Sequence, residues 1–377
     1  MYKRILQLNE ITRKSIFLLG PRQVGKSTLI RQQLDDYISF NLLDTGVYRQ
    51  LSADPGHMKR EIIAQAEKKL VVIDEIQLLP ELLNEVHLLI EEHKKKFILT
   101  GSSARALKRK GVNLLGGRAN MYHLHPFVSC ELGEDFDLDR AINNGLLPPF
   151  YLSENANKDL GDYIGLYLKE EIAAEGLTRN IPSFSRFLEV AALSNGTIIN
   201  INNIASDAEV KRTTVADWLQ VLKDTLIAYE LPAWTKTKNR KAIARSKFYF
   251  FDVGVVRFLT GQREIERQNP WYGIALETFI FHELKAYVDY GRGQSLQYWR
   301  STSGFEVDFL LDEKFAIEIK AATNVNKNDF KGLNALQEES KPWKRILVYL
   351  GASRQDWDGI KVYPLKKFLE LLWNEEL

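Results

Sequence analysis

Continuous apolar runs and amphipathic stretches alternate through the first third of the chain. Three runs have the continuity of strands buried on both faces: residues 16–19, 69–74 and 96–101. Residues 37–43 are predicted as a further strand. Stretches with helical spacing lie between them, after Ser27, over 55–68 and over 80–93. This alternation predicts an α/β fold built on a parallel sheet.

The middle of the chain shows two other patterns. Residues 126–180 lose the strand pattern and are rich in Leu, Asp and Glu, which predicts a small helical lid. A short helix over 201–207, a turn over 208–212 and a longer helix over 213–224, opened by a Thr cap, have helix-turn-helix spacing. Two short strands follow at 226–230 and 247–251, so this segment resembles a winged helix.

The last third contains an amphipathic helix over 274–289 and three short strands at 296–299, 306–311 and 315–320. A chain of 377 residues exceeds what one hydrophobic core usually supports, so we expect two or three domains. The patterns divide it into an α/β core at 1–127, a helical lid at 128–180, a winged-helix-like segment at 181–260 and a C-terminal α/β domain at 261–377.

Composition says more about the compartment in which the protein works than about the molecule that it binds. A formal charge of +2 does not indicate nucleic acid by itself, so such a signal must come from local clustering. The single cysteine, Cys130, excludes an intramolecular disulfide framework and suits a reducing compartment. No apolar run reaches the roughly 18 residues that span a bilayer. We expect a soluble cytoplasmic protein without a membrane partner.

The segment between the first strand and its helix fits the pattern GxxxxGK[ST], from Gly20 to Ser27. Its glycines allow the backbone to wrap a phosphate chain, Lys26 can reach the β- and γ-phosphates, and the Ser27 hydroxyl can ligate Mg²⁺. A chance match is the alternative, but the flanking strand and helix argue against it. The expected ATP-binding residues are Gly20, Pro21, Arg22, Gln23, Val24, Gly25, Lys26, Ser27 and Thr28.

Acidic and hydroxyl side chains follow the other predicted strands of the sheet. Asp74 and Glu75 end the third strand, at the edge where open α/β sheets bind ligands. Asp74 is expected to hold Mg²⁺ through water, and Glu75 to polarise the water that attacks the γ-phosphate. Thr100 and Ser102 end the fourth strand and can sense the γ-phosphate or hold that water. Alternatively, they cap the next helix.

Arg118 follows two glycines in the segment KRKGVNLLGGR, residues 108–118, just before an apolar strand starting at Tyr122. It could reach the nucleotide of its own or a neighbouring subunit as an arginine finger, which neutralises charge on the transferred phosphoryl group. An exposed surface arginine is the alternative. A finger acting on a neighbour would require a homo-oligomer, such as a ring or dimer.

The loop between the two strands of the winged-helix-like segment is strongly basic. Its sequence TKTKNRKAIARSK contains no acid. In winged helices such a loop can lie beside DNA, where each cation on a phosphate releases counterions. A protein contact or a solvated hairpin would explain the same residues. The cations are Lys236, Lys238, Arg240, Lys241, Arg245 and Lys247.

The C-terminal strands carry a set of carboxylates with a lysine. Glu306 and Asp308 lie two apart on one strand, and Glu318 and Lys320 two apart on its hairpin neighbour. Such a set can bind Mg²⁺ and orient water for attack on a phosphodiester. Glu277, on the preceding helix, could add a fourth group. Cross-strand salt bridges on an exposed face are the alternative.

With these motifs the chain resembles a bacterial and archaeal family of single-chain ATPases. Its members have an N-terminal AAA-type P-loop module and a C-terminal domain of unknown function resembling restriction-endonuclease (PD-(D/E)xK) folds. The resemblance covers nearly the whole chain and rests on GPRQVGKST, LVVIDEIQ, LTGSSA, LLGGR, FFDVGVVRFL, ALETFIFHEL and GFEVDFLL with AIEIKAA. It implies ATP binding by residues 20–28, hydrolysis through Asp74 and Glu75, and a nuclease-like set of Asp308, Glu318 and Lys320.

Two functions fit these residues. One is an ATP-binding and Mg²⁺-dependent ATP-hydrolysing protein that acts on DNA, with a nuclease-like C-terminal domain. The other is a nucleotide-regulated protein-interaction switch, whose winged-helix and nuclease-like parts bind a protein partner or oligomerise. The basic loop discriminates between them, because DNA binding through it would weaken steeply with salt.

Overall fold

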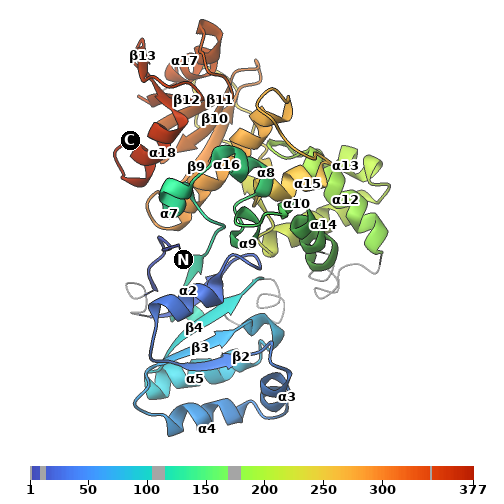
Figure 1. The fold of residues 1–377 in the computed structure, drawn as a ribbon, viewed down its shortest axis with the longest axis vertical. Helices are drawn as coiled ribbons and strands as arrows, with labels where there is room; N and C mark the ends of the chain where they lie inside the picture. Colours follow the sequence, from blue (N-terminus) through green and yellow to red (C-terminus); the bar gives the residue numbers. More distant parts are fainter. Residues whose placement is uncertain (1, 9–13, 104–114, 169–179, 340–341) are drawn as a thin grey trace. The chain divides into compact units, whose positions relative to one another are not determined.

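The computed structural model describes residues 2–8, 14–103, 115–168, 180–339 and 342–377 (Figure 1). These residues form two compact units. The first comprises residues 1–126 with 221–227, and the second comprises residues 127–220 with 228–377. No helix in the described ranges is both long and apolar enough to cross a membrane.

The first unit is built on a five-stranded parallel sheet with the order β2-β3-β4-β1-β5. The strands are β1 (Ser15–Leu19), β2 (Ile38–Asn41), β3 (Leu70–Asp74), β4 (Lys96–Gly101) and β5 (Ala119–His123). The first four expected strands are confirmed, with differences at their ends. All five residues of β1 are buried, as the unbroken apolar run requires. Because the strands are parallel, the segments that follow them meet at one edge.

Helices connect these strands. They are α2 (Lys26–Gln33), α3 (Thr45–Ala53), α4 (Gly56–Ala64) and α5 (Leu82–His93), with short 3₁₀ turns η1 (Ile76–Leu78) and η2 (Leu115–Gly117). Helix α3 was not predicted. Leu51 is its one buried residue, so it shows no apolar stripe. Its start is capped instead by Asp44, which accepts hydrogen bonds from the N–H groups of Gly46 and Val47.

The second unit begins with helices that pack among themselves and against later helices. They are α7 (Ser129–Leu132), η3 (Gly133–Asp135), α8 (Leu138–Asn144), α9 (Pro148–Tyr151), α10 (Ala156–Asp162) and η4 (Tyr163–Leu168). Within this unit α8 packs against α15 (Val253–Leu259) and α16 (Trp271–Asp289). The helical character expected for 128–180 is found up to Leu168. Residues 169–179 lie outside the described ranges, and the lid role stays a prediction.

The segment expected to resemble a winged helix, residues 181–260, contains four helices and a small antiparallel sheet. The helices are α12 (Ile181–Leu193), α13 (Ile201–Asp207), α14 (Arg212–Asp224) and α15, whose bounds are given above. The sheet has the order β6-β8-β7, with strands β6 (Thr197–Ile198), β7 (Ala228–Leu231) and β8 (Lys247–Phe250). Within the second unit, Trp218 of α14 packs edge-on against Phe184 of α12, so these two helices are in contact through their aromatic side chains.

The C-terminal part of the second unit is a six-stranded mixed sheet with the order β13-β14-β12-β11-β10-β9. Sequence analysis expected three of these strands, β9 (Leu296–Arg300), β10 (Glu306–Leu311) and β11 (Phe315–Lys320), and they are confirmed. The others are β12 (Lys344–Tyr349), β13 (Gln355–Trp357) and β14 (Ile360–Pro364). Helices α16 and α17 (Lys331–Gln337) pack against β10 and β11, and α18 (Leu365–Trp373) packs against β12 and β14.

Candidate nucleotide and metal sites

The phosphate loop lies between β1 and α2 at the carboxyl edge of the parallel sheet. Gly25 has a φ of 95°, in the left-handed region that favours glycine. A Cβ on Gly20 would lie 2.4 Å from the carbonyl oxygen of Leu124, so this position accepts no larger side chain. Pro21 and Val24 are buried, whereas Gln23 is exposed and Arg22 and Thr28 are half-buried.

Lys26 and Ser27 open helix α2 and point in different directions. The buried Lys26 ammonium donates to the carbonyl oxygens of Gly20 at 2.7 Å and Pro21 at 3.1 Å, inside the loop. The Ser27 hydroxyl donates to Asp74 Oδ2 at 2.9 Å. The structure therefore brings Ser27 and Asp74 together across the sheet edge, as oxygen ligands of one Mg²⁺ would have to be.

Thr100 links the two acids at the end of β3. Strand β4 lies between β1 and β3, so its last residues reach the middle of the edge. The Thr100 hydroxyl donates to Asp74 Oδ1 and accepts from the Glu75 backbone N–H at 3.1 Å. Glu75 has a φ of 59°, a strained conformation that turns its carboxylate away from the strand direction.

Gln77 is a site residue that sequence analysis missed. Its side-chain amide donates both to Glu75 Oε2 and, at 3.1 Å, to the Ser102 hydroxyl. The Glu75 side chain is thereby held between β3 and β4. The motif LVVIDEIQ contains Gln77, but spacing alone does not show where a residue after a left-handed turn points. The segment after Ser103 is outside the described residues, so the helix-cap alternative for Thr100 and Ser102 is not tested.

Arg4 also supports the phosphate loop and was not predicted. Its buried guanidinium donates to the carbonyl oxygens of Val24 at 2.8 Å and His125 at 2.5 Å. These bonds tie the loop to the segment that follows β5. An arginine near the N-terminus carries no sequence signal for this role, because both partners are backbone atoms.

Arg118 lies at the opposite edge of the sheet from the phosphate loop. Strand β5 runs parallel to β1 with Ala119 beside Ser15, at the start of both strands. The phosphate loop follows Leu19, roughly 16 Å farther along. Arg118 instead pairs with Glu91 on α5 and holds the pKa of that carboxyl below its usual value. Arg118 thus lies away from its own phosphate loop, and its role as an arginine finger, on its own or a neighbouring subunit's nucleotide, stays a prediction. Residues 108–114 of its segment lie outside the described ranges.

In the second unit, the predicted carboxylates come together where β10 and β11 part. A bulge interrupts the pairing of β10 with β9 between Val307 and Leu310, so simple strand alternation does not hold across Asp308. The β10–β11 ladder ends at Phe309 and Ile317. Beyond it, Asp308 Oδ2 accepts the backbone N–H of Ile319 at 2.8 Å and thus lies in the fork between the strands.

Glu318 and Lys320 lie on β11 beside Asp308. The Lys320 ammonium donates to Glu318 Oε1 at 2.7 Å. The other carboxylate oxygen, Glu318 Oε2, is buried and has no hydrogen-bond partner among the described residues. Only 8% of Glu318 is exposed, so this oxygen is withdrawn from bulk water as well. A buried carboxylate oxygen without a partner is costly unless a cation or donor reaches it.

Lys247 and Tyr249, on β8, complete this cluster and were not predicted as part of it. The buried Lys247 ammonium lies 3.0 Å from Glu277 Oε1 and 2.7 Å from Glu306 Oε1. The Tyr249 hydroxyl donates to Glu277 Oε1 at 2.5 Å. Sequence analysis had assigned Lys247 to the exposed basic loop. The structure shows it buried, because its charge partners come from α16 and β10.

The cluster has an excess of negative charge. Four carboxylates, Glu277, Glu306, Asp308 and Glu318, face three cations, which leaves one uncompensated negative charge when all are ionised. The cations are the ammonium groups of Lys247 and Lys320 and the Arg300 guanidinium, 3.4 Å from Glu306 Oε2. Burial raises the pKa of Asp308 well above its usual value, and Glu318 and Glu277 raise it further. Burial also raises the pKa of Glu318 to about 7, although Lys320 opposes this. Burial disfavours the Lys247 ammonium, yet Glu277, Asp308 and Glu306 outweigh it and raise its pKa.

The lysines also separate the carboxylates from one another. Among the described residues no group of three or more His, Cys, Asp or Glu side chains is arranged to hold a metal ion. Glu277 and Glu306 are instead joined through Lys247. The salt bridges that were the alternative to a metal site are therefore present, but they lie within a buried cluster and not on an exposed face. Asp308 and Glu318 Oε2 take no part in them.

The predicted basic loop, residues 235–247, is called the basic connection below. The segment that contains it, from β7 to β8, is hydrogen-bonded along β9. The backbone N–H of Trp234 donates to the Tyr298 carbonyl at 2.7 Å, and the backbone N–H of Ile243 donates to the Arg300 carbonyl at 2.8 Å. The buried Glu339 accepts the backbone N–H groups of Lys238, Asn239 and Arg240.

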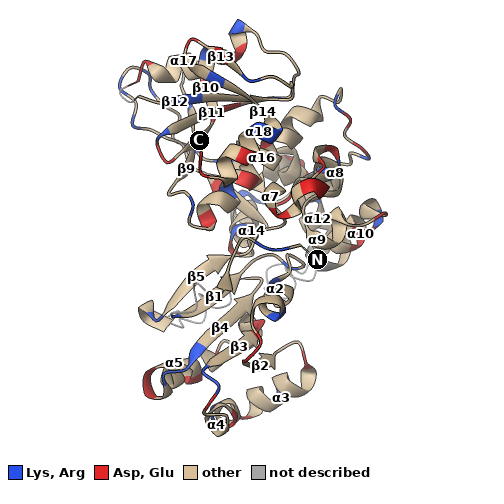
Figure 2. Ribbon diagram, turned by 60° about the vertical axis from the view of Figure 1, so that its left-hand side comes forward, with Lys and Arg blue, Asp and Glu red and all other residues tan. Residues whose placement is uncertain are grey.

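Half of the cations in this connection are paired. Lys236 pairs with Glu313, Arg240 with Glu338, and Lys247 with the acidic cluster. Lys238, Lys241 and Arg245 are exposed, and none of them forms an ion pair among the described residues. Figure 2 shows Lys and Arg interspersed with Asp and Glu along the chain, so a local group such as this one is the relevant signal.

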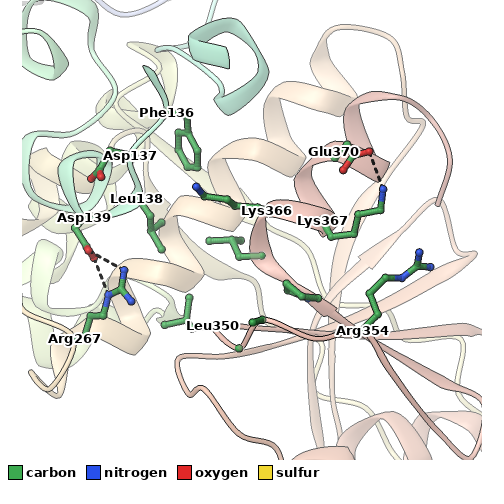
Figure 3. A pocket seen from close by; sticks show the side chains of 14 residues that line it. Phe136, Asp137, Leu138, Asp139, Arg267, Leu350, Arg354, Lys366, Lys367 and Glu370 are labelled. Carbon is green, nitrogen blue, oxygen red and sulfur yellow. Dashed lines mark hydrogen bonds and ion pairs between the residues drawn. The ribbon is translucent and has the colours of Figure 1, made fainter. Parts of the chain in front are cut away.

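A cavity of about 660 Å³ lies elsewhere in the second unit, between α8 and the segment from β12 to α18 (Figure 3). Its charged residues are largely paired with each other: Arg267 with Asp139 at 2.9 Å and Lys367 with Glu370 at 2.7 Å. None of the predicted site residues lines it. The cavity is therefore separate from the chemistry of the acidic cluster.

Comparison with known proteins defines the class of the N-terminal part. Residues 12–133 match the family model described as an AAA domain. Together with the parallel sheet and its phosphate loop, this match identifies the N-terminal part as an AAA-type P-loop ATPase module. Residues 135–266 and 272–368 match two models described as domains of unknown function, DUF8612 and DUF4143 respectively.

Most of the chain is similar to uncharacterized proteins of Mycobacterium bovis and Mycobacterium tuberculosis. Each is 25% identical over 317 residues, which cover 81% of this chain and 70% of the relative. A solved structure of the replication initiator DnaA bound to AMPPCP and single-stranded DNA is 14% identical, with a TM-score of 0.29, covering 57% of this chain and 84% of that chain. AMPPCP-bound DnaA from Aquifex aeolicus is 15% identical, with a TM-score of 0.28 and coverages of 56% and 82%. TM-scores this low do not establish a shared arrangement.

Proposed function

We propose that the N-terminal unit binds ATP with Mg²⁺ and hydrolyses it. The observation that carries this proposal is the hydrogen-bonded chain from Ser27 through Asp74 to Thr100, beside the phosphate loop. In this assignment Lys26 binds the β- and γ-phosphates, and Ser27 and Asp74 hold Mg²⁺. Glu75 activates the attacking water, positioned by Thr100 and Ser102.

Two substitutions separate binding from chemistry. Lys26→Ala should abolish ATP binding, measured by calorimetry. Glu75→Gln should bind ATP but lose turnover by at least about 100-fold, because a general base contributes 10²–10⁴. Glu67→Gln, at an exposed position on the same unit, is the matched control and should keep full turnover. Unchanged turnover in Glu75→Gln would remove Glu75 from its role.

We also propose that the second unit contacts DNA through its basic connection. Three cations there, Lys238, Lys241 and Arg245, are exposed without an ion pair among the described residues. They are held along β9 by backbone bonds, so they form a fixed group and not a mobile loop. Arg240 is excluded from this group because it pairs with Glu338. The segment from α12 to β8 is assigned as the winged-helix-like part.

The salt dependence of DNA binding tests this assignment. Each phosphate contact adds about 0.9 to the slope of log K against log salt, so reversing the three charges should lower the slope by about 3. Reversing Lys158, Lys327 and Lys331, exposed elsewhere in the unit, should leave it nearly unchanged. Binding that ignores salt and both sets of charges would favour the nucleotide-regulated protein-interaction switch.

For the C-terminal part we propose a restriction-endonuclease-like fold with a divalent-metal site for phosphodiester chemistry. The observation that carries this is Glu318 Oε2, buried without a partner in a cluster with excess negative charge. Asp308 and Glu318 would hold Mg²⁺ or Mn²⁺, which activates water, while Lys320 stabilises charge on the phosphate. Cleavage of supercoiled, linear or branched DNA should be lost in Asp308→Ala and Lys320→Ala but kept in Lys26→Ala. No cleavage on any substrate would reduce this part to a binding module.

A further inference from the structure

The acidic cluster has two halves that differ in how their oxygens are satisfied. In the first half, Glu277 and Glu306 share the ammonium of Lys247, at 3.0 and 2.7 Å. The other Glu306 oxygen, Oε2, lies 3.4 Å from the half-buried Arg300 guanidinium at the end of β9. Glu277 Oε1 also accepts the hydroxyl of Tyr249. Only 4% of the Lys247 side chain is exposed, so the ammonium cannot exchange these carboxylates for water. This half already contains a fixed cation.

In the second half, carboxylate oxygens are still available. Asp308 uses one oxygen to accept the N–H of Ile319, and Glu318 uses one to accept the Lys320 ammonium. Glu318 Oε2 is buried without a partner among the described residues. The capacity for a further cation therefore lies between Asp308 and Glu318. In the neighbouring half, formed by Glu277 and Glu306, the Lys247 ammonium already occupies the cation position.

We propose that Lys247 is a built-in cation of this site, so that the site binds one divalent metal ion, at Asp308 and Glu318, and not two. The inference rests on the metal site proposed above. It makes Glu277 a positioning residue for Lys247 and not a metal ligand, which departs from the expectation drawn from the sequence. It also adds Lys247 as a residue for phosphodiester chemistry.

The physical reason is competition between cations for the same carboxylates. A two-metal site places its ions about 3.5–4 Å apart, so that both the attacking and the leaving oxygen are stabilised. A second ion bound by Glu277 and Glu306 would have to displace the Lys247 ammonium. That would leave a buried ammonium without its partners, which is strongly unfavourable. The lysine charge instead supplies the second positive centre.

Counting bound Mn²⁺ tests the inference directly. The full chain carrying Lys26→Ala is used without nucleotide, so that the phosphate loop holds no nucleotide-bound metal, and Mn²⁺ is titrated by calorimetry and electron paramagnetic resonance. One ion per chain is expected with Lys247 and with Lys247→Arg, and two with Lys247→Met. Lys361→Met, at an exposed lysine paired with Asp356, is the matched control and should bind one ion. Glu277→Gln should keep the ion, whereas Glu318→Gln should lose it.

The outcomes separate this inference from the function on which it rests. Two ions with Lys247 in place, loss of the ion in Glu277→Gln, or a single ion of unchanged affinity in Lys247→Met would overturn the inference and leave the metal site standing. No bound Mn²⁺ in any variant would overturn both the inference about Lys247 and the proposed metal site. If circular dichroism shows that Lys247→Met does not fold, the counts for Lys247 and Lys247→Arg decide, and two ions in either would refute it.

Discussion

Glu283 should make the second unit less stable as the pH rises toward 8. It lies on α16, fully buried, and accepts hydrogen bonds from the Ser129 N–H at 2.7 Å, the Ser129 hydroxyl at 2.9 Å and the Trp373 indole at 2.6 Å. Burial raises its pKa from 4.5 to about 7, although these three donors oppose the shift. Glu131, on α7, adds to the increase.

The size and sign follow from this pKa shift. A folded pKa about 2.5 units above the unfolded value of 4.5 corresponds to about 3 kcal/mol at 1.36 kcal/mol per unit. For an acid whose pKa is raised by folding, the folded state binds the proton more tightly than the unfolded chain. Its contribution to stability is therefore fully present below about pH 4.5 and is lost as the pH rises through about 7. Between about pH 5 and pH 8 the loss is about 2.5 kcal/mol.

Glu283→Gln isolates this contribution, because a carboxamide does not titrate. Its single oxygen cannot accept from both the Ser129 N–H and the Trp373 indole, which adds a destabilisation that does not vary with pH. The free energy of unfolding of the unsubstituted chain minus that of the variant should therefore fall by about 2.5 kcal/mol from about pH 5 to pH 8. Glu370→Gln, at an exposed position on α18, is the control and should show no such trend.

Urea unfolding followed by tryptophan fluorescence is the assay. All seven tryptophans belong to the second unit, so their fluorescence reports the unfolding of that unit alone. A difference that stays constant over this pH range would show that Glu283 keeps its ordinary pKa in the folded state. A difference that grows with pH would mean that the three hydrogen bonds outweigh burial, and the reasoning would be refuted.

Two further predictions concern residues that sequence analysis did not single out. Gln77→Ala should lower ATP turnover about tenfold with unchanged ATP affinity, because the hydrogen bonds that this amide makes among the described residues go to Glu75 and Ser102 and none goes to the phosphate loop; equal losses in both quantities would contradict this. Glu339→Gln should lower the urea midpoint of the second unit by an amount equivalent to about 1–3 kcal/mol, because one carboxylate accepts three backbone N–H groups. Lys327→Gln, on the surface of the same unit, should change it little.

The N-terminal unit was largely predictable because its signals are local. The strand before Gly20, the loop and the helix after Lys26 are contiguous, and each acid or hydroxyl follows its own apolar run. The position of Arg118 in the sheet was not predictable, for a non-local reason. Its distance from the phosphate loop depends on β5 pairing in parallel with β1, start to start, and no spacing within its segment contains that information.

The acidic cluster was predictable in part. Asp308, Glu318 and Lys320 lie within two neighbouring strands, so their pattern is visible in the sequence. The membership of Lys247 in this cluster was not predictable, because Lys247 is the last residue of a strongly basic segment and resembles the exposed cations that precede it. Its burial depends on Glu277 and Glu306, which lie 30 and 59 residues farther along the chain. A lysine with an apolar aromatic strand after it, KFYF, is the only local hint.

The basic connection and the acidic cluster share the edge formed by β9. Ala242 bridges Ser301, directly after β9, and Glu306 pairs with Arg300 at the end of that strand. The Thr302 N–H donates to the Lys241 carbonyl at 2.9 Å, so the exposed cations are fixed next to the carboxylates. DNA bound through Lys238, Lys241 and Arg245 would therefore lie along the strand that borders the proposed metal site. On the proposed function, reversing these charges should reduce DNA affinity and cleavage together, while ATP turnover without DNA stays unchanged because Lys26 and Glu75 belong to the other unit.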